Sequence, residues 1–194
     1  MSPAPRVILL DSCAYFRLAR SIHPLLVPTF GVPPPYSLFV LAAFEDEYLT
    51  SSRLRHKFEW VNSAEYKADR EGKKYACRGK NAHEAETAFS YLAAYAKSKN
   101  LLLAPEDLKA LAVGFARKIP VVSDDRAVRQ VAEAHAIECW LTLDLLKLML
   151  DCGRIDLAKV NEIAEYWNHE NDLPRGRQEL RDHYRRLFGI ECPI

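Results

Sequence analysis

Four acidic residues occupy positions from which a parallel sheet would bring their side chains together. Asp11 and Asp125 each follow a short apolar run, and Glu45 and Asp107 fall near the starts of predicted helices. The carboxyl ends of parallel strands meet at one edge of a sheet, where such folds bind ligands. Clustered carboxylates raise one another's pKa unless a cation neutralises them. Because oxygen-only donors suit Mg²⁺ or Mn²⁺ better than zinc, the four residues predict a divalent-cation site.

Two neighbouring acidic side chains leave parts of this assignment open. Glu47, two residues after Glu45, is an alternative to it, and Asp124 is an alternative to Asp125. An aspartate after a strand is also a common helix cap or turn former. A competing hypothesis is therefore an α/β protein in which Asp11 and Asp125 are only caps and lie far apart.

The hydrophobic pattern predicts the elements that would position these residues. Apolar runs predict strands at 6–10, 38–41, 119–122 and 137–141. Amphipathic spacing predicts a short helix or turn at 12–21 and helices at 42–54, 82–98, 106–118, 128–134, 143–150, 157–167 and 175–188. Five prolines predict a loop over 23–35. Strands that alternate with helices indicate an α/β fold with a central, mostly parallel sheet.

Composition sets the class of protein. The chain has 194 residues, 49% hydrophobic and 27% charged, which is typical of one globular domain with at most an appendage. The formal net charge of +1 excludes a strong overall field of either sign. Five scattered cysteines without a close pair indicate neither a zinc site nor a disulfide framework. No 18-residue apolar stretch or secretory signal is visible, so we expect a cytoplasmic protein.

Other kinds of chemistry lack their motifs. No convincing Ser-His-Asp or Cys-His arrangement is present, and the six histidines are dispersed. No glycine-rich phosphate loop occurs, so nothing in the sequence supports ATP or dinucleotide binding.

Four segments together resemble the motifs of the PIN-domain nucleases, especially the compact ribonuclease toxins of prokaryotic toxin–antitoxin pairs. They are residues 7–12, 38–45, 107–112 and 120–126, and their order and spacing carry the resemblance across about residues 6–150. The resemblance implies a PIN-like three-layer fold. It implies a nuclease domain over 1–152, with a helical basic insertion at about 53–98. Residues 153–194 would form a C-terminal helical extension outside the match.

The resemblance also implies an activity. Asp11, Glu45, Asp107 and Asp125 would bind Mg²⁺, or Mn²⁺, and hydrolyse RNA phosphodiester bonds, with Ser123, Glu47 and Asp124 as supporting or alternative residues. A cognate antitoxin protein and a homodimer are the implied partners. A catalytically inactive PIN-like module that binds RNA or protein is the alternative.

A nuclease with an acidic site needs basic residues nearby to hold the phosphate backbone. Residues 53–80 carry nine basic and four acidic side chains, with Trp60, Tyr66 and Tyr75 available to stack on bases. For any one of these residues, a solvated helix face is an equally good explanation. The predicted RNA contacts are Arg53, Arg55, Lys73, Lys74, Arg78, Arg126 and Arg129.

Overall fold

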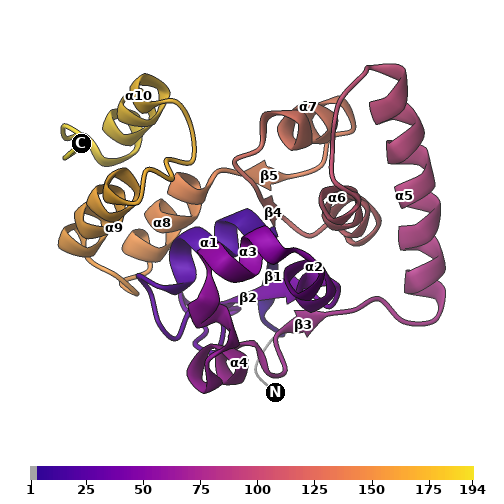
Figure 1. The fold of residues 1–194 in the computed structure, drawn as a ribbon, viewed down its shortest axis with the longest axis horizontal. Helices are drawn as coiled ribbons and strands as arrows, with labels where there is room; N and C mark the ends of the chain where they lie inside the picture. Colours follow the sequence, from indigo (N-terminus) through magenta and orange to yellow (C-terminus); the bar gives the residue numbers. More distant parts are fainter. Residues whose placement is uncertain (1–3) are drawn as a thin grey trace.

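The computed structural model describes residues 4–194 and has a five-stranded parallel sheet at its centre (Figure 1). Its strand order is β3-β2-β1-β4-β5, so β1 is central. Leu9 of β1 pairs with Phe39 on one side and with Val121 on the other. The strands are β1 (Arg6–Leu10), β2 (Tyr36–Leu41), β3 (Lys74–Tyr75), β4 (Val121–Val122) and β5 (Cys139–Trp140). The predicted α/β class is confirmed.

Helices cover both faces of the sheet. They are α1 (Ser12–Ala19), α2 (Phe44–Thr50), α3 (Ser52–Lys57), α4 (Ala64–Arg70), α5 (Lys80–Ser98), α6 (Pro105–Arg117), α7 (Arg126–Ala134), α8 (Thr142–Asp151), α9 (Leu157–His169) and α10 (Arg177–Phe188), with a 3₁₀ turn at Glu59–Asn62. Side chains of a strand alternate between faces. Ile8 and Leu10 therefore join the core with α1 and α8, whereas Leu9 contacts Ala110 and Val113 of α6.

Two differences from the predicted elements have local causes. The helix expected over 42–54 is divided at Ser51, whose backbone is extended and whose hydroxyl caps α3 by accepting the Leu54 N–H at 3.2 Å. The basic segment is not helical throughout, because Lys74–Tyr75 forms the edge strand β3 beside β2. Strand β3 lies in a charge-rich segment without an apolar run, so the hydrophobic pattern does not reveal it.

The proline-rich loop is held by buried polar groups. The Asp69 carboxylate, 2% exposed, accepts the backbone N–H groups of Leu25, Leu26 and Val27 at 2.8 to 3.1 Å. Arg154 donates to three carbonyl oxygens of the same loop. The loop needs these contacts because it has little regular pairing of its own.

Helices α9 and α10 continue the core on the face of α1 and α8, at the opposite end of the molecule from α5 (Figure 1). Trp167 of α9 is buried, and its indole N–H donates to the Arg17 carbonyl at 3.1 Å. His183 of α10 contacts Asp144 of α8 at 3.0 Å. Within the described residues, no helix combines the length and apolar character needed to cross a membrane.

Candidate active site

Asp11 lies at the centre of the carboxyl edge of the sheet. It directly follows β1, and its backbone N–H donates to the Val122 carbonyl of β4 at 3.1 Å. Its carboxylate caps α1 by accepting the Ala14 N–H at 2.6 Å, and the residue is 6% exposed. The expected cap is therefore present, and the same carboxylate also faces a pocket.

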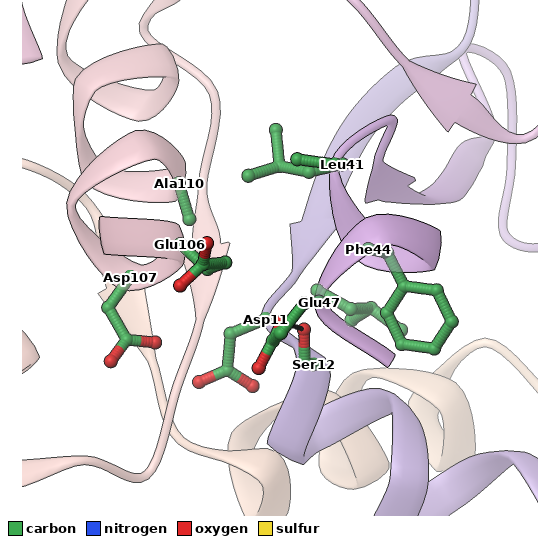
Figure 2. A pocket seen from close by; sticks show the side chains of 10 residues that line it. Asp11, Ser12, Leu41, Phe44, Glu47, Glu106, Asp107 and Ala110 are labelled. Atoms are coloured by element: carbon green, nitrogen blue, oxygen red, sulfur yellow. Dashed lines mark hydrogen bonds between the residues drawn. The ribbon is translucent and has the colours of Figure 1, made fainter. Parts of the chain in front are cut away.

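That pocket, which we call the acidic pocket, lies between α6 and the start of α2 (Figure 2). Asp107 and Glu106 reach it from α6, Glu47 reaches it from α2, and Asp11 lies between them. Among the described residues that line it there is no lysine, arginine or histidine. It leaves about 10 Å³ for the centre of a water-sized sphere, which is room for about one water molecule or small cation.

Burial without a neutralising partner disturbs three of these carboxyl groups. Burial raises the pKa of Asp11 to about 7, and the charges of Asp124 and Asp107 add to the effect, while hydrogen bonds from Ser123 and Ala14 oppose it. Burial, followed by the charge of Asp125, raises the pKa of Asp107 to about 6. Burial also raises the pKa of Glu47. Carboxyl groups disturbed in this way, in a cleft, are typical of functional sites.

The structure brings Glu47, and not Glu45, to the acidic pocket. Glu45 lies outside it and pairs with Lys74 at 2.8 Å and with Arg70 at 3.7 Å. Glu47 lines the pocket and accepts a hydrogen bond from the Ser12 hydroxyl. Residues two apart on a helix point in nearly opposite directions, so only one of them can face the sheet edge. Of the two glutamates left open by the sequence, only Glu47 lies with Asp11 and Asp107 in the acidic pocket.

The residues after β4 take three different positions. Asp124 is buried and fully engaged, because it pairs with Arg17 at 3.1 Å and accepts both the Thr142 N–H and hydroxyl. Asp125 is exposed and caps α7; it does not line the acidic pocket, although its charge acts on Asp107. Ser123 is buried, accepts the Asp125 N–H at 3.2 Å and acts to lower the pKa of Asp11.

The donor atoms of the pocket suit a hard divalent cation, although the acidic side chains are not close enough together to coordinate one ion. All the charged donors are carboxylate oxygens, as Mg²⁺ and Mn²⁺ prefer, and no basic side chain occupies them from within the lining. In residues 4–194, however, no three acidic, histidine or cysteine side chains are gathered tightly enough to hold one ion. The pocket is thus an unclosed set of oxygen donors.

Several predicted RNA contacts are occupied by structural interactions. Lys73 donates to the Ser37 hydroxyl at 2.8 Å, and Lys74 pairs with Glu45. Arg129 is half-buried, and its Nε has no partner. Arg55, Arg78 and Arg126 are exposed, and Arg53 is exposed at the rim of a second pocket.

The three aromatic side chains are less available than the sequence suggests. Tyr66 is 7% exposed and packs against Trp60, with ring centroids 4.5 Å apart. Tyr75 packs edge-on against Phe39. These side chains therefore pack against other aromatic rings of the protein. The sequence did not predict this packing, because the charge-rich segment has no regular hydrophobic spacing.

Two residues near the site escaped the sequence analysis. Glu106 precedes Asp107 in the first turn of α6 and also lines the acidic pocket. Arg17 carries the charge that compensates Asp124. An acid beside a predicted site acid was a usable signal for Glu106, whereas the pairing of Arg17 with Asp124 is a contact across 107 residues.

Comparisons with known proteins add distant similarity of structure. No family model matches the sequence, and no curated protein matches it. A structure of VapBC-5 from Mycobacterium tuberculosis, a member of the VapBC family of toxin–antitoxin systems, aligns at TM-score 0.45 and 16% identity, covering 71% of this chain and 99% of that one. FitAcB from Neisseria gonorrhoeae aligns at TM-score 0.46 and 12% identity, covering 70% and 98%.

The fold and the site define an α/β protein with a parallel sheet, helices on both faces and an acidic pocket at the carboxyl edge. The similarities to solved structures are distant, so the evidence for a function lies in the residues of that pocket.

Proposed function

We propose that this protein is a divalent-metal-dependent endoribonuclease that hydrolyses RNA phosphodiester bonds. The observation that carries the proposal is the acidic pocket, in which Asp11, Glu47, Glu106 and Asp107 converge without a basic side chain among the described lining residues. Such a pocket is costly to a folded chain because its charges are desolvated and repel one another. A cation relieves both costs.

Asp11, Glu47 and Asp107 would hold Mg²⁺, or Mn²⁺, with Asp125 acting on Asp107 through its charge. A bound divalent ion polarises a phosphodiester and lowers the pKa of water that it binds. The chain's own donors hold two of these carboxylates in place, because the Ser12 hydroxyl donates to Glu47 and the Ala14 N–H donates to Asp11. Hydrogen-bond donors of this kind orient the carboxylates that bind a metal and adjust the affinity of those carboxylates for it.

The biological role within the proposal is that of a toxin controlled by an antitoxin. It is supported by the order of the four motif segments that resemble PIN-domain toxins. An antitoxin that covers the acidic pocket would block the reaction directly. A homodimer and a cytoplasmic location belong to the same proposal.

The decisive experiment is cleavage of a mixed-sequence single-stranded RNA by the purified protein, with Mg²⁺ or Mn²⁺ and then with EDTA. Asp11→Asn and Asp107→Asn should each lose about 100-fold or more in rate, because each removes a charge that acts on the metal. Asp46→Asn is the matched control, since Asp46 is an exposed acid of α2 outside the pocket.

The catalytically inactive binding module is the second candidate, and the unclosed donor set favours it. It predicts RNA or protein binding without cleavage. If wild-type protein, shown to be free of antitoxin, cuts RNA no faster than the two variants with any metal, the nuclease proposal is wrong and the binding module replaces it.

A further inference from the structure

A second pocket, which we call the cationic pocket, lies beside the acidic pocket along α1. Ser12 lines the acidic pocket and the next residue, Cys13, lines the cationic one. Arg17, at its wall, is six residues beyond Asp11, about 9 Å along the helix axis. The cavity volume of this pocket is about 330 Å³, which is within the range of ligand sites.

Three basic side chains surround this pocket. Arg17 comes from α1, and Arg53 and Lys57 come from α3. Arg53 takes part in none of the ion pairs found within residues 4–194. The buried Nε of Arg17 has no hydrogen-bond partner, although its Nη1 pairs with Asp124. Arg53 therefore gives the wall donor groups that no acidic side chain of the described residues uses.

An aromatic surface adjoins these cations. The rings of Phe16 and Phe58 are stacked, with centroids 4.3 Å apart and planes 8° apart. Phe16 is buried, whereas Phe58 is half-buried and lines the pocket. An aromatic face beside basic side chains suits a nucleotide, whose base stacks and whose phosphate pairs.

One acid of this chain already lies on the cations. Asp172 contacts Lys57 at 3.2 Å and Arg17 at 3.7 Å. It belongs to the loop between α9 and α10, and among the described residues that line the cationic pocket it alone is acidic. Its carboxylate holds the position that an external anion would take between the two basic groups.

We propose that the cationic pocket binds a phosphate of the RNA strand that flanks the phosphate at the acidic pocket. Arg17, Arg53 and Lys57 contact this flanking phosphate, Phe58 contacts the neighbouring base, and Asp172 competes with the phosphate as an internal counter-ion. The inference rests on the proposed ribonuclease function. It answers a need of that function, because carboxylates repel a phosphate chain that must be held by cations close by.

The test is binding of a short fluorescent single-stranded RNA in EDTA, measured by anisotropy at several salt concentrations. Lys57→Gln and Arg53→Gln should each weaken binding about three- to tenfold and reduce the salt slope by about 0.7, the value for one contact to a single strand. Asp172→Asn should tighten binding about two- to fivefold, in line with the loss of a surface ion pair. Arg17 is not substituted, because its loss would leave the buried Asp124 carboxylate without its positively charged partner.

Lys97→Gln is the charge-matched control, because Lys97 is an exposed cation of α5 that lines neither the acidic nor the cationic pocket. Its effect on affinity should be below about twofold. Equal losses in the Arg53, Lys57 and Lys97 variants would indicate a diffuse charge effect, which overturns the phosphate site and leaves the ribonuclease proposal intact.

Two further outcomes separate the proposals. Wild-type protein that binds no RNA at all overturns both the phosphate site and the ribonuclease function. A polyglutamate peptide that binds through Lys57, and more tightly to Asp172→Asn, while RNA binding ignores both substitutions, would assign the cationic pocket to an acidic protein partner instead.

Discussion

Asp11 is the residue at which stability and chemistry oppose each other. Its buried carboxyl group has a pKa of about 7, against 3.8 for the ordinary group. The folded state therefore retains a proton that the unfolded state loses between about pH 4 and pH 7, and over that range the unfolding free energy falls as the pH rises. Above pH 7 the folded protein bears the full cost of the buried charge, on the order of 2–4 kcal/mol.

Asp11→Asn should consequently stabilise the protein in EDTA at pH 8, and the gain should shrink toward pH 4. Asparagine retains the capping bond to Ala14, so α1 keeps its cap. Urea unfolding at pH 4 to 8 measures the difference. Asp156→Asn, at the exposed cap of α9, is the control and should change stability little at any pH. A variant less stable than wild type at pH 8 would contradict the assigned cost.

Glu47 and Glu45 should respond in opposite ways to neutralisation. Glu47→Gln should reduce RNA cleavage about 100-fold without loss of stability, because it removes a half-buried charge without a basic partner from the acidic pocket. Glu45→Gln removes a partly exposed partner of Lys74, so it should change stability by less than about 1 kcal/mol and leave cleavage unaltered. Cleavage rates and melting temperatures of both variants test this. The reverse pattern would restore the assignment first drawn from the sequence.

These side chains also mark the limit of reading single residues from a sequence. Placement after strands located Asp11, and helix-start placement located Asp107, both in the acidic pocket. The choice between Glu45 and Glu47 depends on the rotation of α2, which packing sets and helical periodicity leaves open. Arg17 and Asp172 acquire their roles through contacts between distant segments that no local pattern encodes.

At the scale of elements, α6 must approach the sheet closely to deliver Asp107. Gly114 permits this approach, because a Cβ there would lie 2.6 Å from Val121 Cγ2 and 3.1 Å from the Ile119 carbonyl oxygen. Gly114→Ala should therefore lower the unfolding free energy by about 1–3 kcal/mol, although alanine is the better helix former. Gly176→Ala, where a new Cβ meets nothing within 4 Å, is the control for urea unfolding. Equal stability of the two variants would show that α6 can shift at no cost.

Elements that carry an apolar run or period were predictable, including the short strands β4 and β5, and elements without one were not. Strands β1 and β2 and helices α5 to α10 carry apolar periods over several turns or residues, and the structure confirms them with shifts of a few residues at their ends. Strand β3 and the break between α2 and α3 are set by tertiary pairing with β2 and by one serine cap. Such features lie below the length over which periodicity is informative.

At the scale of the whole molecule, residues 153–194 share the core of the rest. Val160, Ile163, Trp167, Leu180 and Tyr184 are buried in the same hydrophobic cluster as Ile8 and Leu10 of the central strand. Arg154 ties the loop before β2, and Asp172 reaches the cationic pocket. The sequence could place this extension outside the motif match, but amphipathic helices do not reveal the surface that they cover.

A chain that ends at residue 152 should therefore fail to fold cooperatively. It would expose the apolar faces of α1 and α8 that α9 and α10 now cover. We therefore expect the truncated protein to aggregate, or to bind a hydrophobic dye and unfold without a cooperative transition. Trp167→Ala keeps the full chain and should still cost about 3–5 kcal/mol, since the indole is 1% exposed and donates to the Arg17 carbonyl. Glu165→Ala, on the exposed side of α9, should stay within about 0.5 kcal/mol of wild type. The opposite result would be a truncated chain that unfolds cooperatively in urea and a Trp167 variant as stable as wild type. Residues 153–194 would then be a separable unit, and Asp172 would reach the cationic pocket only when that unit docks.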